Sequence, residues 1–131
     1  MRSLAREIVF KFTYSQLFNP SDEGLFTVLA KELNEDDKQF ATNLVEIIAK
    51  NQEQYLESIS RLSIGYKLNR IFSTDKCALL IGMAEFDGYS DTPVPVIVDE
   101  AVKLAAKFST EKSTDFVNGI LAEYIKEKNN G

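Results

Sequence analysis

The sequence contains no histidine and only one cysteine, Cys77. It therefore lacks the ligand set of the usual zinc sites and the nucleophile and base pair of a covalent enzyme. Cys77 cannot form an internal disulfide, and its place in the apolar run CALLIGMAEF predicts that it is buried. Carboxylates are plentiful, but no two of them stand out as a catalytic pair. We expect a protein that is not an enzyme and that uses no cofactor or metal.

Long apolar runs are also missing. No uncharged stretch approaches the roughly 20 residues that span a bilayer. The first residues, MRSLAREIVFKF, place Arg6 and Glu7 where a signal peptide needs an unbroken apolar segment. We therefore expect a cytoplasmic protein with no membrane contact. A length of 131 residues with 44% hydrophobic residues is most simply one globular domain, residues 1–131.

The net charge of −5 conceals two basic segments in an acidic chain. Residues 1–21 carry three basic side chains against one acid, and residues 61–80 carry four against one. Between them, residues 22–60 carry nine acids against three lysines. Such segments are either solvated helix faces or, if they meet in space, a small anion-binding patch. We predict that they meet, with Arg2 and Arg6 close to Arg70 and to Lys76 or Lys112.

Apolar periodicity predicts helices nearly throughout, and strand-like alternation is absent. Asn34 is placed to cap a long helix that ends near residue 62, with an interruption near Asn51 as an alternative. Ser113 is placed to cap the last helix. The fold class is therefore all-α, with about seven helices over residues 4–18, 25–33, 35–62, 68–72, 73–88, 93–108 and 113–128.

The last helix contains an Asn-Gly pair, which usually marks a turn. Six apolar residues fill one face of this helix, from Phe116 to Ile125, and Asn118 and Gly119 lie just beyond its two edges. Glycine costs about 1 kcal/mol relative to alanine in a helix, so its presence predicts close packing at Gly119. Asn118 is predicted to hydrogen-bond a neighbouring loop.

Three segments are distinctive: LAREIVFKFTY near the start, VDEAVKLAAKF before a Ser-rich turn, and FVNGIL at the head of the final helix. Together they resemble the NusB family of bacterial transcription antitermination factors. They occur in the family's order and cover essentially the whole chain. The resemblance implies an all-α fold of two small bundles that binds single-stranded boxA RNA together with the ribosomal protein NusE. It also implies indirect contact with other Nus factors and RNA polymerase, in antitermination on ribosomal RNA operons.

The resemblance also implies particular residues. The RNA-binding positions that it indicates are Arg2, Arg6, Lys112 and Phe116, with Phe116 offering a ring on which a base can stack. The NusE-facing positions are Tyr14, Asp75 and Glu85, and the structural ones are Asn118, Gly119 and Glu100. Some of the family's arginines are absent, because Ser3 and Leu4 occupy positions that are basic in many members. We therefore expect weak RNA binding by the chain alone and stronger binding with its partner.

Two alternatives remain at this stage. NusB-like domains also occur fused to ribosomal RNA methyltransferases, but 131 residues leave no room for a Rossmann domain, and its glycine motif is absent. The other alternative is a helical module for protein interaction or self-association, including a homodimer, with weak or lost RNA binding.

Overall fold

The computed structural model describes residues 2–20, 24–65 and 70–130. Within these ranges the chain forms six α-helices and one short 3₁₀ helix, so the all-α prediction is confirmed. The helices are α1 (Ser3–Phe18), α2 (Leu25–Leu29), α3 (Glu35–Leu62), α4 (Ser73–Gly88), α5 (Val94–Phe108) and α6 (Glu111–Asn130), with the 3₁₀ helix over Ala30–Glu32. Of the short helix expected over residues 68–72, residues 68 and 69 lie outside the described residues, and residues 71 and 72 are not helical.

Helix α4 is the centre of the molecule. Residues 77–85 of this helix are buried on every side, as expected for a helix that is apolar all round. Helices α1, α3, α5 and α6 all pack against it. Cys77 is fully buried, as predicted, and burial raises the pKa of its thiol to about 12. A buried thiol with a raised pKa has little thiolate at neutral pH, so Cys77 is placed as a core residue.

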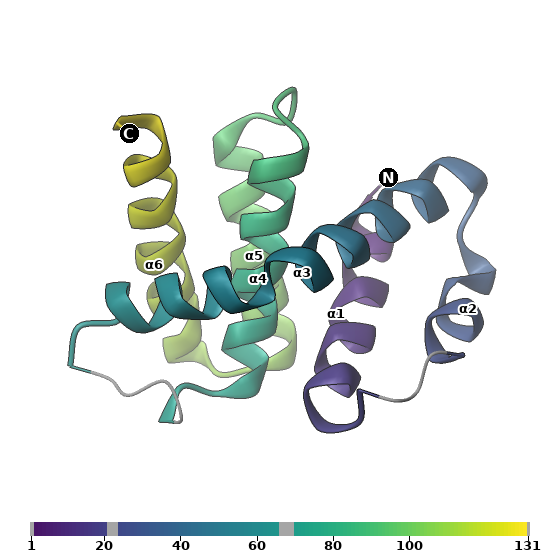
Figure 1. Ribbon diagram of the computed structural model, residues 1–131, viewed down its shortest axis with the longest axis horizontal. Coiled ribbons are helices and arrows are strands. Elements are labelled where there is room, and N and C mark those ends of the chain that lie inside the picture. Colours follow the sequence, from purple (N-terminus) through teal and green to yellow (C-terminus); the bar gives the residue numbers. More distant parts are fainter. Residues whose placement is uncertain (1, 21–23, 66–69, 131) are drawn as a thin grey trace.

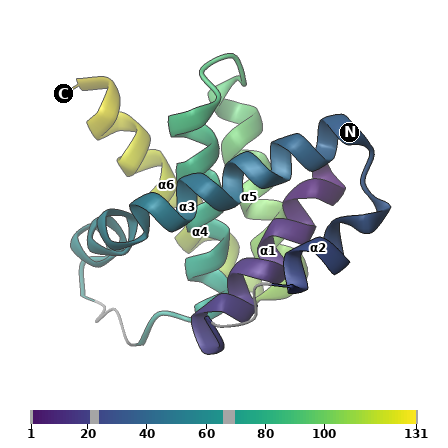
Figure 2. The same ribbon diagram turned by 45° about the vertical axis from the view of Figure 1, so that its right-hand side comes forward.

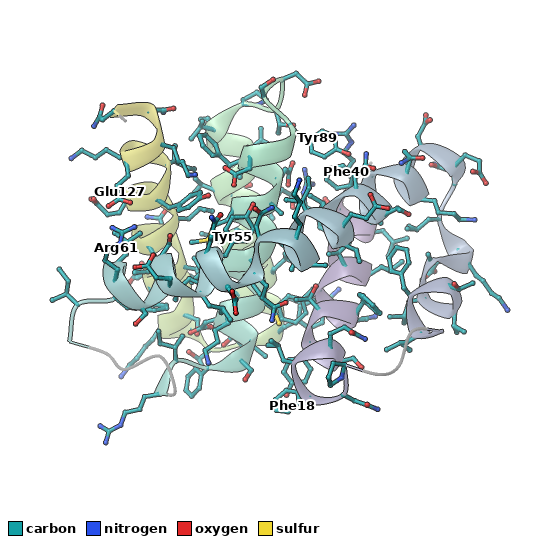
Figure 3. The ribbon with its side chains drawn as sticks, in the orientation of Figure 1. Phe18, Phe40, Tyr55, Arg61, Tyr89 and Glu127 are labelled. Atoms are coloured by element: carbon teal, nitrogen blue, oxygen red, sulfur yellow. The ribbon has the colours of Figure 1, made fainter. Side chains whose placement is uncertain are left out.

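Helix α3 runs between two groups of helices, the arrangement that the family resemblance implies. It lies across α4 in both views, with α1 and α2 near its start and α6 near its end (Figures 1 and 2). Asn34 caps it as predicted, because its side-chain oxygen accepts a hydrogen bond from the Asp37 amide at 2.8 Å. The helix continues through Asn51, whose side-chain amide donates a hydrogen bond to the Ile47 carbonyl one turn earlier. At the far end, Arg61 donates two hydrogen bonds to Glu127 of α6 (Figure 3).

Helix α6 begins earlier than the sequence predicts. Its first residue is Glu111, and Ser113 lies within its first turn. Thr110 takes the capping place, since its hydroxyl accepts from the Ser113 amide at 3.2 Å while the Ser113 hydroxyl accepts from the Thr110 amide at 3.3 Å. This reciprocal pair is the arrangement of a capping box, formed here by two hydroxyl residues. None of the helices in the described parts of the chain is long and apolar enough to cross a bilayer.

Candidate nucleic-acid interface

A pocket of about 190 Å³ lies where the starts of α4 and α6 meet, and we name it the α4–α6 pocket. Its lining combines two cations, two aromatic rings, a carboxylate and small polar groups: Arg70, Ile71, Phe72, Asp75, Thr110, Lys112, Ser113 and Phe116. The sequence predicted that Arg70, together with Lys76 or Lys112, would lie near Arg2 and Arg6. Arg70 and Lys112 both line this pocket. The sequence also singled out Phe116 and Asp75, although for different partners.

Charge and exposure make the α4–α6 pocket suited to an anion with a flat apolar group. Arg70 and Lys112 are exposed, and neither forms an ion pair with any residue in the described ranges. The ring of Phe72 is 56% exposed, whereas Phe116 is half-buried against the core. Cations that track a phosphate backbone, beside rings on which bases stack, are the usual elements of a single-stranded nucleic-acid site. Phe72 is not predicted from the sequence, because one exposed aromatic residue between helices leaves no periodic signal.

Arg6 has a different environment from the one that an RNA-contacting arginine needs. Its guanidinium is 5% exposed and donates two hydrogen bonds to the carboxylate of Glu85, both at 2.7 Å. Glu85 is itself only 1% exposed, and Glu100 lies 3.4 Å from the same guanidinium. Phosphate contact by Arg6, or partner contact by Glu85, would require this buried pair to open. Glu100 also accepts a hydrogen bond from Ser3 at 3.0 Å, so it links α5 to the start of α1.

Arg2 lies one turn before Arg6 and remains exposed. Its guanidinium carbon lies 4.4 Å from the centre of the Phe40 ring and 5.1 Å from that of Tyr89, a cation–π arrangement. Figure 3 shows Phe40 and Tyr89 side by side where α3 passes the end of α4. Arg2 therefore presents a charge at the end of α4 that is opposite the α4–α6 pocket.

The expected single basic patch is consequently divided in two. Arg6 binds Glu85 near the end of α4, whereas Asp75, at its start, lines the α4–α6 pocket. Ten residues of helix separate these two carboxylates, which is about 15 Å along the axis. The prediction that Arg2 and Arg6 share a surface with Arg70 and Lys112 is wrong, because α4 holds the two pairs at its opposite ends. Lys11, the third cation of the first basic segment, lies beside Thr74 at the start of α4.

A second surface depression adjoins the start of α4, and we name it the α1–α5 groove. It measures about 440 Å³ and is lined by Phe10, Lys11, Tyr14, Thr74 and Phe108. Tyr14 is 39% exposed, and Phe18, one turn further along α1, is 65% exposed and projects from the lower edge in Figure 3. Thr74 precedes Asp75, so the groove and the α4–α6 pocket meet at the first turn of α4.

The Asn-Gly pair of α6 lies on the surface. A methyl group at Gly119 would meet no atom within 4 Å, so the close packing predicted there is wrong. The close approach in this region is at Gly82 of α4, where an added Cβ would lie 2.6 Å from Leu121 Cδ2 and 3.3 Å from Ala101 Cβ. Asn118 is exposed and lines a shallow depression between α5 and α6.

Comparisons with known proteins agree with the all-helical fold. The family model described as NusB family matches residues 1–126. The transcription antitermination protein NusB of Acetivibrio thermocellus is 35% identical over 130 residues, covering 97% of this chain and 90% of that protein. Among solved structures, T. maritima NusB matches with a TM-score of 0.90 at 29% identity, covering 97% of this chain and 92% of that one. A structure of antitermination factors NusB and NusE in complex with dsRNA matches with a TM-score of 0.85 at 25% identity, covering 96% of each chain.

These matches and the fold first define a class, that of helical transcription factors which are not enzymes. More narrowly, the chain belongs to the NusB family of transcription antitermination factors. The family resemblance read from the sequence is thereby confirmed, together with the NusB-like fold and the non-enzymatic class.

Proposed function

We propose that this protein binds boxA-type single-stranded RNA together with the ribosomal protein NusE, and so supports transcription of ribosomal RNA operons. The observation that carries the proposal is the α4–α6 pocket, in which two cations that form no ion pair with another described residue flank exposed aromatic surface. In this role Arg70 and Lys112 hold phosphates while Phe116 and Phe72 offer faces to a base. The NusB and NusE structure with dsRNA supports RNA and NusE as the partners of the family.

Arg2 and Arg6 have separate roles in this proposal. Arg2 adds a phosphate contact at the other end of α4, where a longer RNA passes. Arg6 supports that end from within, because its pair with Glu85 fixes α1 against α4. Tyr14 and the rest of the α1–α5 groove receive NusE, since an exposed aromatic surface beside the RNA pocket lets both partners touch each other. Asp75 lies between the two surfaces and is mostly buried, so its part is to shape their shared edge.

Other Nus factors and RNA polymerase join through NusE and the RNA, and the bacterial cytoplasm is the compartment where this assembly forms. Self-association as a homodimer stays a prediction that light scattering on the chain alone can test.

The test is RNA affinity measured by fluorescence anisotropy, with boxA RNA as a single strand and as a duplex, each with and without NusE. The variants are Arg70→Ala and Lys112→Ala, and Lys126→Ala is the control because it removes an exposed lysine elsewhere on α6. Each pocket variant is expected to lower the slope of log affinity against log salt by about 0.7 on the single strand. The control should keep the parental slope.

Two outcomes would reject the proposal. Equal salt slopes for all three variants would show that the pocket cations do not meet phosphate. Absence of RNA binding, with or without NusE, would leave the alternative hypothesis, a helical module for protein interaction or self-association.

A further inference from the structure

The hydroxyl of Ser109 joins three helices in the wall behind the α4–α6 pocket. Ser109 directly follows α5 and accepts a hydrogen bond from Thr74 of α4 at 2.8 Å. It donates to the Asp75 carboxylate at 2.7 Å and lies 2.9 Å from the hydroxyl of Ser113 in α6. One oxygen atom therefore ties the end of α5 to the starts of both α4 and α6.

The direction of these hydrogen bonds follows from counting protons. A carboxylate only accepts, so Ser109 gives its single proton to Asp75. The bond between Ser113 and Ser109 must then be donated by Ser113. Ser113 has no further proton, so Thr110, 2.9 Å away, donates to Ser113. Each hydroxyl thus has one orientation, and the chain of bonds runs from Thr110 through Ser113 and Ser109 to Asp75.

This chain of bonds sets the place of the groups that face the RNA. Ser113 is 2% exposed and Asp75 is 5% exposed, so water does not readily replace either partner. Lys112 precedes Ser113 in the sequence, and Phe116 follows it by three residues on the same helix. Ser109 itself does not line the pocket, so any effect that it has on a ligand acts through the helices that it joins.

We propose that Ser109 is a positioning residue for RNA binding, a proposal that rests on the function proposed above. Its hydroxyl holds the first turn of α6 against the start of α4, and so keeps Lys112 and Phe116 at the right separation from Arg70. Alanine at position 109 leaves Thr74, Asp75 and Ser113 each without one hydrogen-bond partner. The first turn of α6 then moves relative to α4, while both pocket cations remain present.

The test is RNA affinity of Ser109→Ala and of Ser109→Thr, which keeps the hydroxyl. Thr114→Ala is the matched control, because among the described residues its hydroxyl bonds only within the first turn of α6, to the Glu111 carbonyl at 2.9 Å. Ser109→Ala is expected to bind boxA RNA roughly three- to tenfold more weakly, the loss typical of one misplaced hydrogen-bonded contact, with its salt slope unchanged. Ser109→Thr and Thr114→Ala should bind like the parent.

A double-mutant cycle with Phe116→Ala separates positioning from a general loss of stability. If Ser109 acts through Phe116, the two affinity losses overlap. Adding Ser109→Ala to the Phe116→Ala variant then reduces RNA affinity by a smaller factor than adding it to the parent. Losses that multiply fully, or a Ser109→Ala protein with parental affinity, would overturn the proposal while leaving the proposed function standing.

A parent protein that binds no RNA would overturn both proposals. If Ser109→Ala is too unstable to assay, Thr74→Ala removes one of the three hydrogen bonds and should weaken binding about twofold. Parental affinity of Thr74→Ala would then count against the positioning role.

Discussion

Replacing Arg6 by alanine tests whether this residue supports the fold or contacts RNA. The substitution removes two hydrogen bonds of 2.7 Å and leaves Glu85, 1% exposed, as an uncompensated buried carboxylate. Breaking a buried pair in this way costs about 3–5 kcal/mol of unfolding free energy. At a urea slope of about 2 kcal/mol per M, a loss of about 4 kcal/mol lowers the unfolding midpoint by about 2 M. The RNA salt slope of the folded variant should stay at the parental value.

Two further variants make the experiment decisive. Arg2→Ala removes an exposed arginine one turn away and should cost only about 0.5–1 kcal/mol, the value of an exposed cation–π contact. The double variant Arg6→Met with Glu85→Leu removes both charges and should recover most of the lost stability, because no buried charge is left unpaired. The reasoning fails if Arg6→Ala lowers the free energy of unfolding by less than about 1 kcal/mol while the slope of log RNA affinity against log salt falls by about 0.7.

Two other predictions concern packing and pH. Gly119→Ala should stabilise the protein by about 1 kcal/mol through helix propensity. Gly82→Ala gains the same propensity but overpacks against Leu121, so its free energy of unfolding, measured in urea, should be about 1–3 kcal/mol lower than that of Gly119→Ala. Equal midpoints for both would refute the close packing at Gly82. The raised pKa of Cys77, about 12, means that the folded state favours the neutral thiol. Its contribution to stability is complete below the ordinary thiol pKa and is lost as pH rises from about 9 to 12, so unfolding free energy should fall over this window. Cys77→Ala should show a shallower fall, and an unchanged profile would contradict the assignment.

Local signals in the sequence predicted the helices well. Asn34 followed by three acids is a capping pattern that needs nothing from the rest of the chain, and the structure forms it. The start of α6 was misplaced because Thr110 and Ser113 are equally good caps by type. The choice depends on Ser113 bonding to Ser109 across the turn, which is a tertiary contact.

The candidate site was predictable only in part, because residue type does not report burial. Arg6 looks like a surface arginine until Glu85, 79 positions away in the sequence, is placed against it. Gly119 shows the opposite error. Its environment depends on which neighbour faces that edge of α6, and no described residue of another element lies within 4 Å of an added Cβ there. Lys112 and Phe116, which the family resemblance indicated, line one pocket with Arg70. A family resemblance carries tertiary information that periodicity lacks.

The complete burial of the middle of α4 also shapes how this protein can change through evolution. Residues 77–85 are constrained by contacts on every side, so substitutions there are selected for packing. Within α4, the positions open to new recognition properties are therefore at its two ends, where Asp75 borders the pocket and Tyr89 meets Arg2. The buried middle of α4 can then remain unchanged while the chain acquires a preference for a different RNA or a different partner.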